Sequence, residues 1–312
     1  MEDFYGILST MVQGRERIRI APRDRGLVHV EGPDAAEFLH RIGSQDVEGL
    51  AVGGVAPTAF LNPKGKIVAL ATLGRTDSGV WLEMPRPARD AVADYLDRFH
   101  FTERLSIARP ELASGTFLGT EAWAIAGIES AGLSVSDDGV IAFAIAVGEL
   151  QLLSLHGTEE RLARASEHVD VLDARFAPAV GLLLRDFVVG EQLDDATIAL
   201  EAPIEDHIST TKGCYTGQEI VARIHTYGHV NRRLVCLRSV GGAIPVAGAS
   251  LLETVEFDPV GRVTAAVPLP DGWLGVGYVP REFAEPNTAL RVGVATGDEA
   301  RIVAYADASG PA

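Results

Sequence analysis

The chain is poor in cysteine, methionine and lysine. Its 312 residues include two cysteines, three methionines and only three lysines among 27 basic residues. Two cysteines are too few for a disulfide scaffold, so a reducing compartment is expected. The 43 acidic residues outnumber the basic ones and give a net charge of −16. Such a surface repels phosphate backbones and anionic membranes, so neither nucleic acids nor membranes are expected as partners.

Long apolar runs and targeting signals are also missing. The longest strongly apolar run, Val140 to Val147, is far shorter than the roughly 20 residues that cross a bilayer. The acidic start at Glu2 and Asp3 lacks the basic region of a signal peptide. P-loop, Gly-x-Gly-x-x-Gly, Gly-x-Ser-x-Gly and His-Glu-x-x-His motifs are absent as well. We therefore expect a cytoplasmic protein without these common nucleotide, hydrolase or zinc-protease sites.

The residues that are present predict an α+β fold. Because 47% of them are hydrophobic, the chain can bury a sizeable core. Up to residue 231, apolar periodicity predicts strands that alternate with helices. The expected elements are a hairpin of 17–20 with 27–30, a meander over 58–84, strands over 122–128 and 140–155, and helices over 33–42, 87–99 and 159–168.

From residue 232 onward the pattern changes to short strands between Gly and Pro turns, which is typical of a small antiparallel barrel. The expected strands are 233–240, 261–266, 274–279, 290–294 and 301–305. The sequence thus predicts a region 1–231, with a second subdomain starting near 115, followed by a barrel domain over 232–312.

One segment, Lys212 to Arg238, combines several chemically useful features. It holds five basic residues and one acidic residue, which predicts a local positive patch. Thr216 and Glu219 have the spacing of a capping box, which predicts a helix from Gly217 to about Gly228. Cys214 would precede that helix, where the helix N-terminus and the nearby Lys212 favour a thiolate.

The two cysteines have different expected roles. Cys214 is either a reactive thiol or an ordinary buried cysteine, and its polar neighbours favour the first. Cys236 lies in a strand pattern and is expected in the core. A metal site of Cys214 with His225 and His229 is not expected, because no fourth ligand has a recognisable spacing. Nor can two cysteines alone hold an iron–sulfur cluster, which takes about four thiolates.

The run Lys212-Gly213-Cys214-Tyr215-Thr216-Gly217-Gln218-Glu219 resembles the signature of the YgfZ family. These are folate-binding proteins that support iron–sulfur enzymes and are similar to the aminomethyltransferase, or T-protein, of the glycine cleavage system. Further segments resemble the same family: 24–26, 32–35, 44–47, 60–67 and 261–264. The resemblance implies a T-protein-like ring of domains around a central folate-sized cavity, lined by the motif, with a C-terminal antiparallel β-barrel.

The resemblance also implies particular site residues. The thiol chemistry would involve Cys214, as a redox group or transient cluster ligand, with Lys212 and Tyr215. The cofactor, a tetrahydrofolate derivative, would be held by Asn62, Lys64, Lys66, Gln218, Glu219 and Arg223. The implied partners are iron–sulfur client enzymes or cluster carriers.

Two departures from the family pattern bear on the activity. Val68-Ala69-Leu70 stands where the aminomethyltransferase carries acidic residues, so aminomethyl transfer is not expected. In members of the family, an arginine is followed by a glutamate that would accept hydrogen bonds from the N–H donors of a pterin. Here Phe176 follows Arg175, and Glu191 or Glu201 would have to replace that glutamate. The sequence predicts an accessory factor for iron–sulfur clusters rather than a conventional enzyme. A folate-dependent one-carbon enzyme and an RNA-binding module acting through Lys212–Arg238 are the alternatives.

Overall fold

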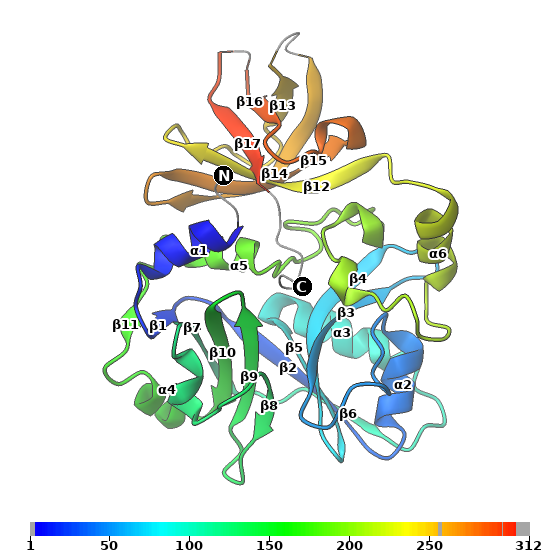
Figure 1. Cartoon of the computed structure of the whole chain (residues 1–312). Helices are drawn as coiled ribbons and strands as arrows, with labels where there is room; N and C mark the ends of the chain where they lie inside the picture. The colour runs from blue at the N-terminus through cyan, green and yellow to red at the C-terminus, as the bar shows by residue number, and fades with distance from the viewer. Residues whose placement is uncertain (1–3, 255–257, 295, 304–312) are drawn as a thin grey trace.

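The computed structural model describes residues 4–254, 258–294 and 296–303, which form three β-structures around a shared core (Figure 1). A five-stranded and a six-stranded sheet lie at one end of the molecule, and a closed barrel of six strands lies at the other. This arrangement confirms the predicted α+β fold with a C-terminal antiparallel barrel.

The five-stranded sheet is built on the predicted meander. Its strands are β2 (Arg25–Glu31), β3 (Val55–Leu61), β4 (Ile67–Arg75), β5 (Gly79–Pro85) and β6 (Ser106–Ala108). They pair in the order β3-β4-β5-β2-β6, so the three consecutive strands of the meander are confirmed. Helices α2 (Ala35–Ile42) and α3 (Arg86–Asp97) cover one face, where Phe38, Leu39 and Leu96 are buried. Both helices confirm the apolar periodicity of the sequence.

The six-stranded sheet has the order β11-β1-β7-β10-β9-β8. Its elements are β1 (Ile18–Ile20), β7 (Ala113–Gly119), β8 (Gly132–Val135), β9 (Ile141–Val147), β10 (Leu150–Gly157) and β11 (Asp170–Val171), with helix α4 (Glu159–Ala165). The predicted hairpin of 17–20 with 27–30 is wrong, because β1 pairs with β7 and β11 whereas β2 pairs with β5 and β6. The turn residues between them carry the chain from one sheet to the other.

The predicted strand over 122–128 is also wrong. These residues form a 3-10 helix, η1 (Ala122–Ala126), which ends at Gly127 with a φ of 66°. Trp123 fixes this turn over β10, since its indole Nε1 donates to the carbonyl of Leu152 at 2.9 Å. Burial of one aromatic ring and satisfaction of its N–H therefore override the strand-like apolar run.

The barrel closes in the order β12-β15-β14-β13-β16-β17. Its elements are β12 (Arg232–Val240), β13 (Ser250–Glu253), β14 (Pro259–Leu269), β15 (Gly272–Pro280), η4 (Arg281–Phe283), β16 (Ala289–Val292) and β17 (Glu299–Val303). The sequence pattern found every strand except β13, and the end of its last strand, at Tyr305, lies outside the described residues. Trp273 is fully buried at the centre of the barrel core.

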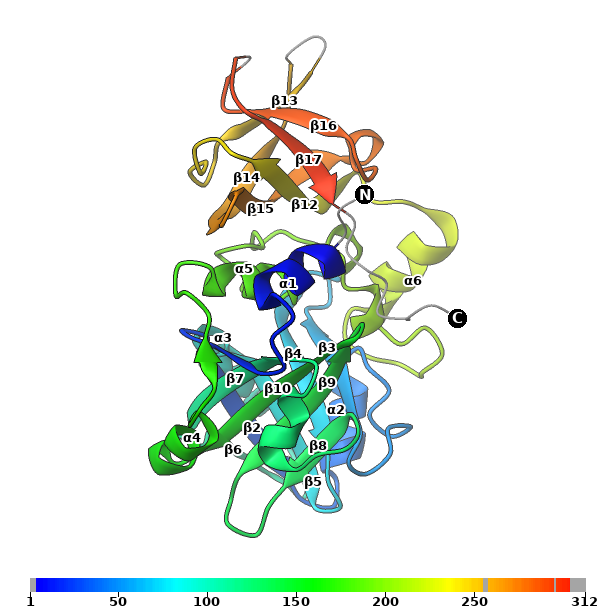
Figure 2. The ribbon, with the colours of Figure 1, turned by 60° about the vertical axis from the view of Figure 1, so that its left-hand side comes forward.

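Short helices fill the space between the three β-structures. They are α1 (Phe4–Val12), α5 (Ala177–Leu183), η2 (Ala199–Glu201), η3 (Glu205–His207) and α6 (Gln218–Tyr227). Figures 1 and 2 show α1 and α5 between the six-stranded sheet and the barrel. The largest apolar core joins residues of both sheets, of the helices α1, α5, η2 and α6, and of the barrel. The division at residues 115 and 231 stays a prediction. No helix in the described ranges is both long and apolar enough to span a membrane.

Candidate functional site

The motif enters α6 through a left-handed glycine. The N-cap residue is Gly217, with a φ of 86°, and no side chain caps the helix. The predicted capping box of Thr216 with Glu219 is therefore wrong, because the helix begins one residue later than that box requires. The predicted end of the helix at Gly228 is confirmed.

Two glycines let the motif dock closely against the turn between β3 and β4. A Cβ at Gly217 would lie 2.7 Å from the carbonyl oxygen of Asn62, and one at Gly65 would lie 2.8 Å from Ile220. Asn62 shapes the same turn, since its Oδ1 accepts from the backbone N–H groups of Lys64 and Lys66 at 2.9 and 3.2 Å. The turn and the motif thus form one packed unit at the end of the five-stranded sheet.

We expect Gly217→Ala to lower the free energy of unfolding by about 1–3 kcal/mol, because the residue keeps a positive φ and its Cβ meets a backbone oxygen. The matched control is Gly213→Ala in the same motif, where nothing lies within 4 Å of the added Cβ. Urea unfolding should show a change within about 0.5 kcal/mol for that control. Equal stabilities of the two variants would contradict the docking geometry.

Lys212 anchors the motif to the end of α2. Its Nζ donates to the carbonyl oxygens of His40, Gly43 at 2.7 Å and Gln45 at 2.9 Å. An ammonium has three N–H donors, so these carbonyls use all of them, and the cation offsets the negative C-terminal end of the helix. Burial lowers the pKa of Lys212 to about 8, against the opposite effect of Asp46 and Glu48. The structure therefore gives Lys212 an anchoring role, and its part in thiol chemistry stays a prediction.

Lys212→Met should reduce stability by about 2–3 kcal/mol, since it leaves buried carbonyls at a helix end without their donor. The control is Lys64→Met, because the Lys64 side chain is exposed and its removal should change little. Thermal unfolding of both variants measures the difference. A Lys212→Met protein as stable as the wild type would show that the three contacts contribute nothing.

Cys214 is exposed, and Cys236 is buried in β12. Because Cys214 is exposed, it is not an ordinary core cysteine. The burial of Cys236 confirms its predicted core position. Tyr215, next to Cys214, is buried, with the Lys212 Nζ 5.2 Å from the centre of its ring. Within the described ranges, no group of three or more His, Cys, Asp or Glu side chains could hold a metal ion.

The predicted positive patch over Lys212–Arg238 is largely neutralised, because acidic residues from distant segments pair with three of its four arginines. Arg232 binds Asp194 and Glu201 at 2.8 and 2.9 Å. The other two pairs are Arg233 with Glu205 at 3.5 Å and Arg238 with Asp271 at 2.6 Å. A count of charges along the sequence cannot include such partners, so it overestimates the local positive charge.

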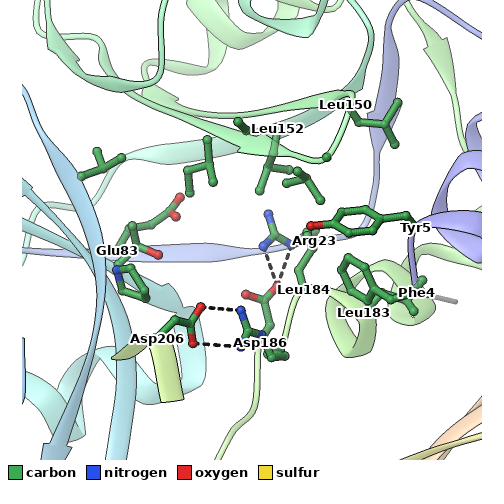
Figure 3. Close-up of a pocket in the computed structure, with 18 of the residues that line it drawn as sticks. Phe4, Tyr5, Arg23, Glu83, Leu150, Leu152, Leu183, Leu184, Asp186 and Asp206 are labelled. Carbon is green, nitrogen blue, oxygen red and sulfur yellow. Dashed lines mark hydrogen bonds and ion pairs between the residues drawn. The ribbon is translucent and has the colours of Figure 1, made fainter. Parts of the chain in front are cut away.

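A cavity of about 930 Å³ lies where the two sheets, α1 and α5 meet. This volume is within the range of about 300–1,000 Å³ that small-molecule sites occupy. Much of its wall is apolar, with Phe4 and Tyr5 from α1, Leu150 and Leu152 from β10, and Leu183 from α5. Figure 3 shows these side chains on the side away from Glu83 and Asp206. The cavity therefore has an apolar and a charged region.

None of the predicted site residues lines this cavity. The motif docks at the turn that joins β3 to β4, whereas the cavity is lined by residues 55–57 at the start of β3 and by residues 70–72 in the middle of β4. The expectation that the motif lines the central cavity is thus wrong, and the motif and the cavity are separate features of the five-stranded sheet. The predicted roles of the motif residues are untested by this geometry.

The first part of the charged region is a buried network. Asp186 accepts from Arg23 Nε at 2.8 Å and from Arg25 Nη1 at 2.9 Å. Arg25 also donates to Glu83 at 3.1 Å, and the other oxygen of Glu83 lies 2.8 Å from His156 Nε2. Burial raises the pKa of Glu83, but Arg25 and His156 outweigh it and hold this pKa well below its usual range. The carboxylate therefore stays ionised despite its burial.

The second part of the charged region is centred on Asp206. Arg185 donates to both of its oxygens, at 2.8 and 2.5 Å, and His207 Nδ1 lies 2.9 Å from Oδ1. Burial raises the pKa of Asp206, whereas His207 and Arg185 lower it to about 2. Burial also lowers the pKa of His207, against the opposing effect of Asp206. A carboxylate and an imidazole are thus held together in the cavity wall.

The carboxylates of the cavity are not those that the sequence suggested. Arg175 lies on the surface and pairs with Asp173 at 2.6 Å, Glu201 pairs with Arg232, and neither Glu191 nor Glu201 lines the cavity. The wall uses Glu83, Asp186 and Asp206 instead, with Glu149 also in the lining. The feature of the sequence that could have indicated this charged region is the pair Arg185-Asp186, which directly follows the apolar run of α5.

Comparisons with known proteins agree with this fold. No protein-family profile matches the chain. A tRNA-modifying protein YgfZ of Serratia proteamaculans is 27% identical over 295 residues, which cover 88% of this chain and 87% of the relative. A chloroplastic protein of Arabidopsis thaliana, whose name describes a transferase, is 24% identical, and the alignment covers 86% of this chain but only 66% of that protein.

The solved structures include a similar fold. The glycine cleavage system aminomethyltransferase T of Bartonella henselae superposes with a TM-score of 0.78 at 20% identity, covering 96% of this chain and 88% of that protein. The resemblance to the YgfZ family and the T-protein-like fold are therefore both confirmed.

Proposed function

We propose that the cavity binds a reduced folate and that the protein is an accessory factor for the assembly or repair of iron–sulfur clusters, with Cys214 as its reactive thiol. The observation that carries the cofactor part is the cavity, with its apolar wall and its charged region. The client part is supported by the YgfZ relative and by an exposed cysteine in the family motif.

The cavity residues fit the chemistry of a pterin. A pterin edge carries adjacent N–H donors, and an ionised carboxylate has about four acceptor positions. Glu83 uses two of them, for Arg25 and His156, which leaves acceptor capacity for a ligand. Phe4, Tyr5 and Leu183 offer apolar surface for the rest of the molecule. A tetrahydrofolate bound here would supply one-carbon chemistry at its ring nitrogens.

Calorimetric titration with tetrahydrofolate tests the cofactor part. Thr72 lines the cavity beside Glu83 on the neighbouring strand, is half-buried, and has no side-chain hydrogen bond in the described part of the chain. Thr72→Trp should therefore fill the cavity without breaking a polar contact, and Thr72→Val is its isosteric control. We expect saturable binding to the wild type, binding at least about tenfold weaker in the Trp variant, and a change within about twofold in the Val variant.

Two results would contradict the proposal. One is an absence of saturable tetrahydrofolate binding by the wild type. The other is a Thr72→Trp protein that is folded by circular dichroism and binds as tightly as the wild type.

A second candidate function is a folate-dependent one-carbon enzyme. The paired Asp206 and His207 favour it, because they supply a proton acceptor that the segment Val68–Leu70 lacks. Turnover of a methylamine substrate in the presence of tetrahydrofolate would support this candidate over the accessory factor.

A further inference from the structure

The strongest feature that the predicted site does not include is the imidazole of His207 in the cavity wall. Its backbone is fixed from two directions: Ser44 Oγ donates to the His207 carbonyl at 2.6 Å, and Gln45 Nε2 donates to the Asp206 carbonyl at 3.0 Å. Arg185 in turn fixes the Asp206 carboxylate with two bonds. The imidazole is therefore held in one orientation by two separate segments of the chain, 44–45 and the one that carries Arg185.

The contact with Asp206 determines which ring nitrogen carries the proton. An ionised carboxylate accepts hydrogen bonds only, so the nitrogen that faces it, Nδ1, must donate. In the neutral ring this leaves Nε2 as the acceptor, with an available lone pair. The arrangement of an acid, Nδ1–H and a free Nε2 is the one in which histidine works as a general base.

The Nε2 atom is available to a ligand. His207 lines the cavity, and 9% of its side-chain surface remains accessible. Among the described residues, none makes a hydrogen bond to Nε2, and this atom is not among the buried polar atoms that lack a partner. The available nitrogen therefore borders open space in the cavity.

The charges around His207 favour a neutral ring at neutral pH. Burial, with Arg185, lowers the pKa of the imidazole, while Asp206 and Glu205 raise it, and the net direction is down. The same cavity is lined by further charged groups of both signs: Glu83, Glu149, Asp186, Arg23 and Arg25. Three of these are acidic and two are basic, so they add one net negative charge to the wall.

We propose that His207 Nε2 accepts a hydrogen bond from an N–H group of the ligand in the cavity, and that Asp206 is the positioning residue that fixes its tautomer. This inference rests on the proposed binding of a reduced folate. In this contact no covalent bond breaks: the ligand N–H donates, the lone pair of Nε2 accepts, and the ring stays neutral. Asp206 keeps the proton of the ring on Nδ1 and so keeps the lone pair on Nε2.

The first test uses the ligand-free protein. A ¹⁵N-resolved NMR titration of the imidazoles, with His207 assigned by the His207→Asn variant, reports both tautomer and pKa. We expect the Nδ1–H tautomer and a titration below the ordinary value of 6.5. In Asp206→Asn the titration should move to still lower pH, because a carboxylate that raises this pKa is lost. A proton on Nε2, or titration at or above 6.5, would overturn the proposal whether or not a folate binds.

The second test measures tetrahydrofolate affinity between about pH 5 and pH 8. A protonated ring has no acceptor, so the affinity of the wild type should fall as the pH falls through the titration of His207. His207→Asn keeps a donor at the Nδ1 position and removes the Nε2 base, so its affinity should be about tenfold lower at neutral pH and independent of pH in this range.

If tetrahydrofolate affinity depended on pH in the same way in the wild type and in His207→Asn, the role of His207 would be overturned while folate binding stayed intact. Absence of binding by the wild type at every pH would instead refute the proposed function, and the NMR titration alone would then decide the state of His207.

Discussion

Arg25→Met lowers the free energy of unfolding by about 3–5 kcal/mol, the largest stability effect that we expect from a single substitution in this chain. Arg25 is almost fully buried and joins Glu83 on β5 to Asp186, which follows α5. Removing the guanidinium leaves the buried Glu83 with His156 as its remaining partner. Asp186, whose side chain is 16% exposed, keeps only its pair with Arg23 among the described residues. Urea unfolding followed by circular dichroism measures the loss.

The matched control is Arg17→Met, which breaks an ion pair of nearly the same length. Arg17 lies 3.0 Å from Glu121, compared with 3.1 Å between Arg25 and Glu83, but about half of each side chain in the Arg17 pair is exposed. Exposed pairs contribute about 0–1 kcal/mol, so this variant should be nearly as stable as the wild type. Equal losses in the two variants would show that burial of the Arg25 network does not determine its contribution.

The Arg25 network also makes stability depend on pH. Because the pKa of Glu83 is lowered in the folded state, its stabilising contribution is complete above its ordinary value of 4.5 and is lost as the pH falls toward the folded value. In Arg25→Met, fewer positive charges oppose the effect of burial on the pKa of Glu83, so the Glu83 carboxyl takes up its proton at higher pH. Acid unfolding of the variant should therefore begin at higher pH than that of the wild type.

Under the proposed function, we expect Cys214→Ala to abolish support of cluster-dependent enzymes and to leave the fold intact. The side chain is exposed, so its truncation should change the free energy of unfolding by less than about 0.5 kcal/mol. The proposed chemistry needs the sulfur as a ligand or redox group, so the functional loss should be complete, and Cys214→Ser should fail equally. The readout is methylthiolation of tRNA in a bacterial strain whose own YgfZ gene is deleted.

Cys236→Ala is the matched control for the loss of a thiol. Cys236 is buried in β12, so this variant should lose about 1 kcal/mol of stability but restore methylthiolation. If Cys214→Ala restored methylthiolation as well as Cys236→Ala does, the thiol would have no role.

The parts of the fold that the sequence predicted are those set by local pattern. The apolar stripe of α2 and the turn at Asn62–Gly65 each depend on neighbours in the chain, and both were found. The pairing of β1 was missed because its partners, β7 and β11, lie about 100 or more residues away. The strand predicted over 122–128 was wrong for a related reason, since the acceptor of the Trp123 indole N–H lies on β10.

The motif was predictable and the cavity was not. The run Lys212–Glu219 is continuous, so a single stretch of sequence identifies it. The charged region of the cavity combines Arg25, Glu83, Asp186 and Asp206 from four distant segments, and each residue alone is an ordinary charged residue. The positive charge of Lys212–Arg238 was overestimated from the sequence, because the acidic residues that neutralise it, such as Asp194 and Asp271, lie outside this segment.

The most direct test of the whole account is the tRNA methylthiolation level in the deletion strain complemented with Thr72→Trp. This variant changes the cavity at Thr72, in the middle of β4, and Cys214 does not line that cavity. We predict that it fails as Cys214→Ala fails, and that Thr72→Val restores the wild-type level, since function needs both the bound folate and the thiol. Full restoration by a folded Thr72→Trp protein that no longer binds tetrahydrofolate would contradict this claim.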